Sequence, residues 1–96
     1  MSKIILQGHI LVPDQELVVV KNELATHIEL TRQETGCIKF EVVQDKFQLN
    51  KFTVYEEFMD QKSFDNHQLR VKSSAWGKVS RNVERHYQIT GSVKNV

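Results

Sequence analysis

Few of the residues typical of disulfide-bonded, repetitive or linker-containing proteins occur in this sequence of 96 residues. It has one cysteine, Cys37, so it has no partner for an intramolecular disulfide. Its single proline, Pro13, and its four glycines are scattered, and no low-complexity stretch separates one part from another. These absences predict a single domain over residues 1–96 and a reducing cytoplasm as its location.

Long apolar runs and an excess of one charge are also missing. The apolar start around Ile4 and Leu6 is followed at once by Gln7 and His9, so it is too short for a signal peptide, and no segment is long enough to span a bilayer. Lys and Arg number 13 against 12 Asp and Glu, without a long run of either sign. The composition therefore predicts neither a nucleic-acid partner nor a membrane partner.

Sequence motifs for cofactors and metals are absent too. The glycines form neither a phosphate-binding loop nor a dinucleotide fingerprint. The four histidines, at positions 9, 27, 67 and 86, show no His-x-x-x-His spacing, and there is no cysteine pair. We expect no metal site and no cofactor.

Hydrophobic periodicity predicts the first three elements. Residues 3–12 are rich in branched apolar side chains and stop before Pro13, which is typical of a strand followed by a helix start. Residues 14–34 carry apolar side chains three and four positions apart, which predicts a helix despite its β-branched valines; they are Leu17, Val20, Leu24, Ile28 and Thr31. Gly36 is expected to end this helix. Residues 37–44 then read as a strand.

The second half of the chain repeats the pattern. Residues 51–58 read as a strand that forms a hairpin with residues 37–44. Asp60 can cap a helix that carries Phe64, His67, Gln68 and Val71, and Ser73 or Ser74 can cap a second one that carries Trp76, Val79 and Val83. Residues 85–92 are expected to form the last strand and residues 93–96 to fray. This order predicts an α+β, ferredoxin-like β-α-β-β-α-β fold, with a four-stranded antiparallel sheet and both helices on one face.

The predicted strands have apolar side chains on both faces. In the strand of residues 3–12, one face carries Ile4, Leu6, Ile10 and Val12 and the other carries Ile5 and Leu11. In the strand of residues 51–58, one face carries Phe52, Val54 and Phe58 and the other carries Tyr55. In the strand of residues 37–44, one face carries Ile38, Phe40 and Val42 and the other carries Cys37 and Val43. Burial of apolar surface is worth about 25 cal/mol per Å², so a wet second face would cost a domain of this size several kcal/mol. We therefore expect a homodimer through the open sheet face, with a monomer as the alternative.

Two side chains are the candidate catalytic residues. His67 shares the inward stripe of its helix with Phe64 and Val71, and Glu56 shares a strand face with Val54 and Phe58. A polar group in such a position either transfers protons or is a satisfied core residue. In the structural alternative, His67 is hydrogen-bonded to the backbone or to Glu56, and Glu56 forms a salt bridge at the barrel or dimer seam.

Further residues are expected to surround a ligand. The expected substrate pocket consists of Phe40, Phe58, Phe64, Val71, Trp76 and His9, although aromatic residues at helical spacing are more often plain core. His27 is expected to flank the helix seam and His86 to be solvated. Cys37 is expected to be a small buried hydrophobe rather than a nucleophile.

Two segments resemble the antibiotic biosynthesis monooxygenase family of dimeric α+β barrels. Gly36-Cys37-Ile38-Lys39-Phe40 is similar to the opening of its second strand, and Phe52-Thr53-Val54-Tyr55-Glu56-Glu57-Phe58-Met59-Asp60, followed by Phe64 and His67, is similar to its glutamate-to-histidine signature. The resemblance covers almost the whole chain in order and spacing. Many members have a second histidine where this chain has Ser73, so a mechanism with two helix histidines is not expected.

The resemblance implies an activity without selecting one. Family members include cofactor-independent oxygenases of phenols and quinols, haem-degrading enzymes, and an isomerase that breaks down a phosphorylated quorum signal. Haem degraders usually carry an asparagine late in strand 1, where this chain has Gln7, Gly8 and His9. We expect a cofactor-independent monooxygenase of a small electron-rich phenol or quinol; the alternatives are a small-molecule isomerase and a non-catalytic small-ligand binding protein.

Overall fold

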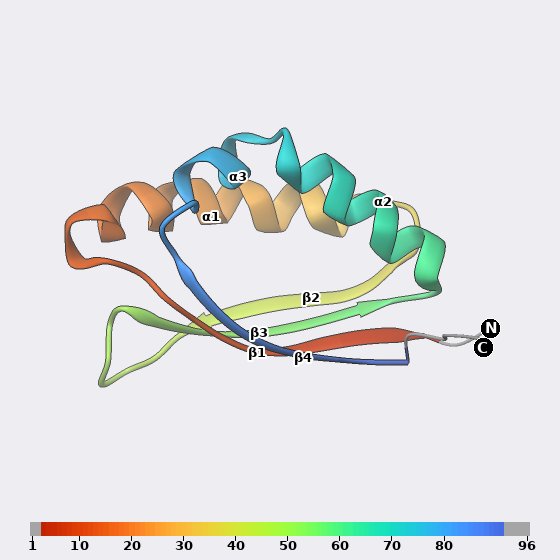
Figure 1. Cartoon of the computed structure of the whole chain (residues 1–96), viewed down its shortest axis with the longest axis horizontal. Helices are drawn as coiled ribbons and strands as arrows, with labels where there is room; N and C mark the ends of the chain where they lie inside the picture. The colour runs from red at the N-terminus through yellow and green to blue at the C-terminus, as the bar shows by residue number, and fades with distance from the viewer. Residues whose placement is uncertain (1–2, 92–96) are drawn as a thin grey trace.

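The computed structural model describes residues 3–91 and confirms the predicted order of elements (Figure 1). They are β1 (Ile4–Leu11), a 3-10 turn η1 (Asp14–Glu16), α1 (Leu17–Arg32), β2 (Cys37–Gln44), β3 (Lys51–Phe58), α2 (Gln61–Lys72), α3 (Ala75–Val79) and β4 (Glu84–Thr90). None of the helices in this part of the chain is long and apolar enough to cross a membrane. Residues 93–96, which we expected to fray, lie outside the described residues.

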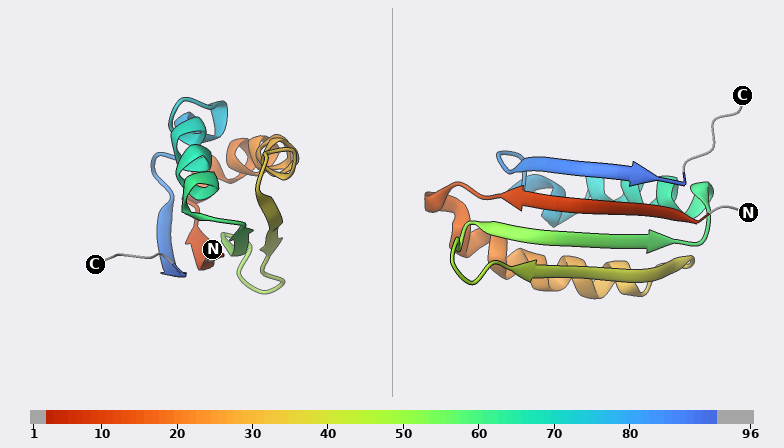
Figure 2. Two further views of the ribbon diagram at one scale, coloured as in Figure 1. Left: turned by 90° about the vertical axis from the view of Figure 1, so that its right-hand side faces the viewer. Right: turned by 90° about the horizontal axis from the view of Figure 1, so that it is seen from below.

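The sheet has the strand order β2-β3-β1-β4, and every neighbouring pair is antiparallel. The connection through α1 passes over β3, and the connection through α2 and α3 passes over β1. All three helices cover the same face of the sheet, and the views from the end and from below show no element of residues 3–91 on the other face (Figure 2). This is the α+β ferredoxin-like fold that the sequence predicts.

The core lies between the central strands and the helices. Alternate residues of β1 and β3 point at the helices and are almost completely buried: Ile4, Leu6, Ile10, Phe52, Val54 and Phe58. Helix α1 contributes Val20 and Leu24, while Val18 and Val19 are exposed. The valine run therefore folds as helix because its apolar face is buried, which outweighs the low helix propensity of β-branched residues.

Local capping brings α1 and α2 close together beside the sheet. The side chain of Asp60 accepts a hydrogen bond of 2.8 Å from the backbone N–H of Ser63 at the start of α2. Gly36 follows α1 with a φ of +90°, and a Cβ atom there would lie 2.1 Å from the Ser63 hydroxyl oxygen. Glycine thus permits both the turn and the close approach, and it places the end of α1 next to α2.

The open sheet face is more polar than the strand pattern predicts. A β-bulge between Cys37 and Lys39 turns Cys37 towards the core and leaves Ile38 exposed, the reverse of the expected arrangement. Ile5 and Leu11 of this face pair with the polar residues Thr90 and Glu84 of β4. The residues of β4 that point outward on this face are Glu84, His86, Gln88 and Thr90. The face is therefore mixed, because the edge strand adds no apolar side chain to it.

Candidate active site

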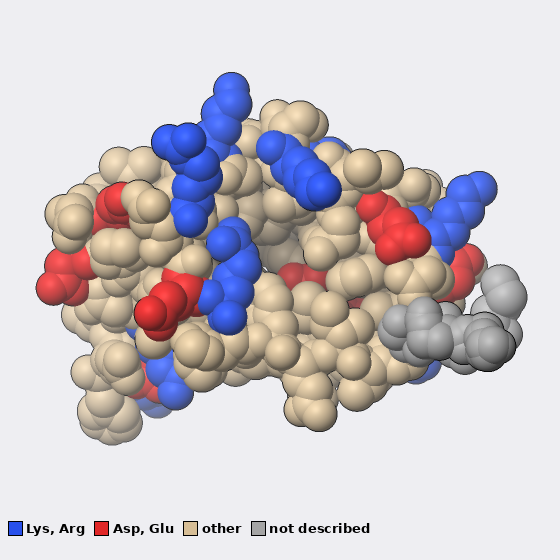
Figure 3. Space-filling view, viewed as in Figure 1, with Lys and Arg blue, Asp and Glu red and all other residues tan. Residues whose placement is uncertain are grey.

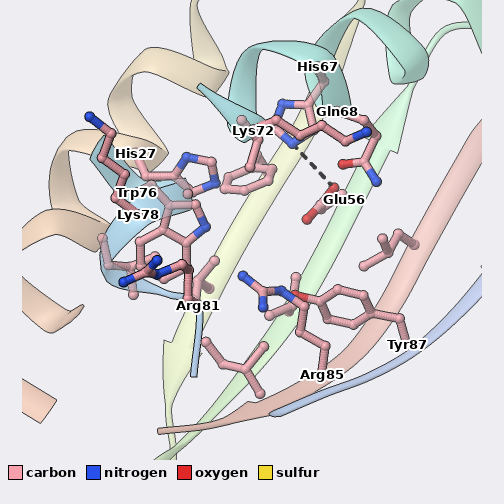
Figure 4. Close-up of a pocket in the computed structure, with 18 residues that line it drawn as sticks. His27, Glu56, His67, Gln68, Lys72, Trp76, Lys78, Arg81, Arg85 and Tyr87 are labelled. Atoms are coloured by element: carbon pink, nitrogen blue, oxygen red, sulfur yellow. Dashed lines mark ion pairs between the residues drawn. The ribbon is translucent and has the colours of Figure 1, made fainter. Parts of the chain in front are cut away.

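A cavity of about 520 Å³ lies between the sheet and the helices (Figure 4). Five of the residues predicted for the site line it: His67, Glu56, Phe40, Val71 and Trp76. The other two aromatic residues predicted for the pocket lie behind His67 and not at the wall. The ring of Phe58 is centred 5.0 Å from that of His67, and Phe64 packs edge-on against Phe58 at 5.7 Å.

His67 is held by a carboxylate that the sequence analysis did not identify. It is buried on α2, and its Nδ1 lies 2.9 Å from Oε1 of Glu34, just beyond the end of α1. Arg70 also donates a hydrogen bond to Glu34, and it donates another, of 3.0 Å, to the Thr31 hydroxyl. A carboxylate can accept a hydrogen bond but cannot donate one, so Nδ1 of the neutral imidazole carries the proton. The other ring nitrogen, Nε2, is then a free acceptor.

The environment keeps His67 neutral. Burial lowers the pKa of the imidazole below its usual value of 6.5, and this effect exceeds the opposing charge of Glu34. Arg70 lowers the pKa further. At neutral pH the side chain therefore has an unprotonated Nε2, which is the state that a general base requires.

Glu56 faces the free nitrogen of His67 from β3. Its Oε1 lies 3.9 Å from Nε2, and this oxygen has no hydrogen-bond partner within residues 3–91. Burial, assisted by the charge of Glu34, raises the pKa of Glu56 to about 8. The carboxyl group is protonated at neutral pH and can donate a proton. Glu34, not Glu56, is the hydrogen-bond partner of His67, because the turn at Gly36 places Glu34 beside α2.

A second imidazole, that of His27, lies on the same wall. It is buried on α1 and stacks on Trp76, with ring centroids 4.9 Å apart and the planes 10° from parallel. Burial lowers the pKa of His27 to about 3, so this ring is neutral too. We expected His27 to flank the helix seam. It lies three residues after Leu24 and four before Thr31, and this spacing would have placed it on the buried face of α1.

Strand β4 contributes two residues that the sequence analysis did not consider. Tyr87 and Arg85 line the cavity on the side opposite His67 (Figure 4). Burial, with a smaller effect of Glu56, raises the pKa of Tyr87 to about 12, although the residue as a whole is 37% exposed. The phenol group therefore remains a hydrogen-bond donor at all moderate pH values.

His9 does not line this cavity. It lies on the other face of the sheet, where its ring stacks on His86 of β4 with centroids 4.8 Å apart. The reason is the two-residue period of a strand, since Leu6 and Ile10 of β1 point at the helices and residue 9 must point away. Within residues 3–91, no group of three or more His, Cys, Asp or Glu side chains has an arrangement that could hold a metal ion.

The raised pKa of Glu56 predicts a pH-dependent stability. The folded protein holds a proton on Glu56 up to a pH of about 8, whereas the unfolded chain releases it near 4.5, so the folded state binds more protons between these values. Stability contributed by Glu56 is then complete below 4.5 and is lost as the pH rises through 8. We expect Glu56→Gln to remove this loss and to raise the free energy of unfolding at pH 9 by on the order of a few kcal/mol more than at pH 5.

Urea unfolding of both proteins at the two pH values measures this effect. Glu29→Gln, at an exposed position on α1, is the matched control and should change both values by the same small amount. An equal effect of Glu56→Gln at both pH values would mean that Glu56 is ionised in the folded protein.

Comparison with known proteins agrees with this architecture. PA3566 from Pseudomonas aeruginosa is 18% identical, with a TM-score of 0.73, over 100% of this chain and 97% of that protein. A conserved protein from Methanosarcina mazei is 24% identical, with a TM-score of 0.70, over 94% of this chain and 90% of that protein. A proposed antibiotic biosynthesis monooxygenase from Deinococcus radiodurans is 17% identical, with a TM-score of 0.72, over 97% of this chain and 95% of that protein. At these identities the likeness establishes the fold alone. No curated protein matches the sequence.

The family follows from the sequence match. Residues 6–78, from β1 to α3, match the family described as antibiotic biosynthesis monooxygenase. The match includes Glu34, Glu56 and His67, and it ends before Arg85 and Tyr87 of β4. Because it covers more than half of the chain, this protein belongs to the antibiotic biosynthesis monooxygenase family.

Proposed function

We propose that the protein is a cofactor-independent monooxygenase of a small, electron-rich aromatic compound, a phenol or a quinol. One observation carries the proposal: Nε2 of His67 is unprotonated and faces a cavity with largely apolar walls. Phe40, Val54 and Trp76 contribute to these walls. A flat aromatic ring fits such surroundings, and its hydroxyl group would donate its proton to His67.

The reaction can be written without a cofactor. His67 takes the phenolic proton, and the resulting anion transfers one electron to O₂, which gives a ring radical and superoxide. The two combine at the ring carbon opposite the oxygen, and His67 returns the proton to the peroxide. Loss of the hydrogen on that carbon and cleavage of the O–O bond release water and leave a quinone. One oxygen atom of O₂ enters the product and the other enters water.

The surroundings favour this sequence in two ways. The apolar walls exclude water, so the phenolate is poorly solvated and gives up its electron more readily. The protonated carboxyl group of Glu56 lies 3.9 Å from Nε2 and can donate a hydrogen bond to the developing peroxide. The cavity is also open, so it has room for a small aromatic compound.

Oxygen consumption tests the proposal. With 1-naphthol as the probe, we expect one O₂ consumed per quinone formed and one labelled oxygen in the quinone when the gas is ¹⁸O₂. Protein with His67 replaced serves as the control for spontaneous oxidation. A quinone whose new oxygen comes from water, or oxygen uptake that is the same without the protein, would contradict the proposal.

The isomerase remains the second candidate, because a neutral base and a neutral acid face each other in the cavity. His67 and Glu56 can remove and return a proton at two positions of one substrate without oxygen. Rearrangement of a hydroxy-ketone under argon, with exchange of substrate hydrogen for solvent deuterium, would favour this reaction over oxygenation.

We also propose that two chains pair through the open sheet face as a homodimer. Ile5, Leu11 and Tyr55 are only half-buried there, and Val43 is 62% exposed. A second copy with the same mixture of apolar and polar side chains would bury these groups on both partners. Closure of the sheet by a second sheet would also cover the face that the three helices leave open.

Val43→Lys is expected to shift this protein towards the monomer. A charge on the buried face of the dimer must be desolvated without a partner, which weakens association, while the folded monomer tolerates it at an exposed position. Sedimentation velocity at several protein concentrations measures the change. Leu69→Lys is the matched control, because Leu69 is 65% exposed on α2, far from the open face. A wild-type protein that sediments as a monomer at all concentrations would contradict the dimer.

We propose a cytoplasmic location, without a membrane or nucleic-acid partner. Cys37 is a free thiol that packs against the core. Burial raises the pKa of this thiol, which keeps it in the unreactive protonated form. The net charge of +1 favours binding neither to nucleic acid nor to an anionic membrane surface. Cell fractionation tests the location, and recovery in a membrane pellet would contradict it.

A further inference from the structure

Four cationic side chains surround the mouth of the cavity. Lys72 ends α2, Lys78 lies in α3, Arg81 follows α3, and Arg85 belongs to β4. We call these four residues the basic rim. All four are exposed, and the space-filling view shows Lys and Arg gathered around a hollow on this side of the molecule (Figure 3). Segments that are separate in the sequence thus bring positive charge to one opening.

The charge of the basic rim is not neutralised by the protein. Within residues 3–91, no carboxylate lies within 4.0 Å of any of these four cations, although other lysines and arginines of the chain do form ion pairs. Among the described residues, Glu56 is the single acidic one that lines the cavity, and its raised pKa keeps it uncharged at neutral pH. An opening with four cations and no compensating anion attracts negative charge.

Arg85 is the member of the basic rim that is held by hydrogen bonds to the protein within residues 3–91. Its guanidinium donates hydrogen bonds to the Ser80 hydroxyl at 2.8 Å and to the Ser80 carbonyl at 3.2 Å. Ser80 is completely buried, so it fixes the orientation of Arg85. The guanidinium lies beside the hydroxyl end of Tyr87 at the cavity (Figure 4). Donors held in advance lose little conformational entropy when an anion binds.

We propose that the substrate of this site carries an oxyanion, a carboxylate or a phosphate, which binds at the basic rim while the aromatic body occupies the apolar cavity. The inference rests on the proposed function, since it describes the substrate of the same cavity. The planar donor groups of Arg81 and Arg85 match the oxygens of either anion. The anion would then set the depth of the ring, so that its hydroxyl group meets His67 on the opposite wall.

Three naphthalene compounds test the proposal by calorimetry. 1-Naphthol is neutral, naphthalene-1-carboxylate and 1-naphthyl phosphate are anionic, and all three have the same apolar body. We expect both anions to bind about tenfold more tightly than 1-naphthol in about 50 mM NaCl, and to lose most of this advantage in about 500 mM NaCl. The affinity of the phosphate relative to the carboxylate shows which oxyanion the rim prefers.

Variants show whether the basic rim is responsible. Lys78→Gln/Arg81→Gln is expected to weaken binding of both anions by about five- to tenfold and to leave 1-naphthol unchanged. Lys21→Gln/Lys62→Gln removes the same charge from exposed positions that do not line the cavity, and it should change neither. Arg85→Gln is measured separately, because it also removes the contacts with Ser80.

The outcomes separate this inference from the proposed function. Equal affinities for the three compounds, or an equal loss in the rim and control variants, would overturn the oxyanion site even if 1-naphthol is oxidised through His67. Anion binding that depends on the rim would support the site even if no hydroxylated naphthalene consumes oxygen, and in that case only the monooxygenase fails.

Discussion

Replacement of His67 by alanine is expected to lower the turnover of a hydroxylated aromatic substrate by about 10² to 10⁴. The reason is that Nε2 of His67 is unprotonated and faces both the cavity and Glu56, and the hydrogen bond from Nδ1 to Glu34 holds it in this state. Loss of the base leaves the substrate as a neutral phenol, which is a poor electron donor. Oxygen uptake under saturating substrate measures the change.

Two further variants define the role of His67. His86→Ala changes an exposed histidine on the other sheet face and should leave turnover within about twofold of the wild type. His67→Gln keeps a polar side chain of similar length in the buried position, and it should be as inactive as the alanine variant while remaining folded. Full turnover in a folded His67→Gln protein would remove His67 from the mechanism.

Phe52→Ala is expected to lower the free energy of unfolding by about 3–5 kcal/mol, a large share of the stability of a small domain. Phe52 is 2% exposed and lies on β3 at the centre of the sheet, paired with Ile10 of β1 and Gln44 of β2. Because the ring is buried, water cannot take its place when the side chain is truncated to alanine. The variant is left with a cavity that the neighbouring residues cannot close. Urea unfolding followed by circular dichroism measures the loss.

Phe47→Ala is the matched control. Phe47 is 96% exposed in the β2–β3 hairpin, so the same change of side chain should alter the free energy of unfolding by less than about 0.5 kcal/mol. If Phe52→Ala fails to fold, Phe52→Leu is measured instead, with a smaller loss expected. A Phe52→Leu protein as stable as Phe47→Ala would contradict the assignment of Phe52 to the core.

The fold was predictable because local patterns dominate it. The valine-rich start of α1 has the composition of a strand, yet the spacing of Val20, Leu24 and Thr31 over about three turns predicted the helix correctly. The bounds of β2 and β3 were also correct, because a short polar hairpin separates two runs of branched and aromatic residues. The bulge at Cys37 was not predicted, since one extra residue in a strand leaves no compositional trace.

The site was only partly predictable. His67 and Glu56 lie in the cavity because helical and strand periodicity place each of them on an inward face. Glu34 was missed because it reaches His67 only through the turn at Gly36, and this is a tertiary contact between residues 33 positions apart. No periodicity encodes such a pairing.

The basic rim shows the same limit. Lys72, Lys78, Arg81 and Arg85 are separated along the sequence by other residues, the acidic Glu84 among them, and the composition as a whole is almost balanced in charge. They form one opening because α2, α3 and β4 end or begin at the same side of the sheet. A local excess of charge of this kind can be recognised only when the fold is known.

The stacking of Trp76 on His27 gives the protein a built-in optical probe. Trp76 is the only tryptophan of the chain, and it lies in the wall of the cavity. All of the indole emission therefore originates at the candidate site, without a background from elsewhere. Collections of unlabelled compounds can be screened against the native protein through the intensity and wavelength of this single emission.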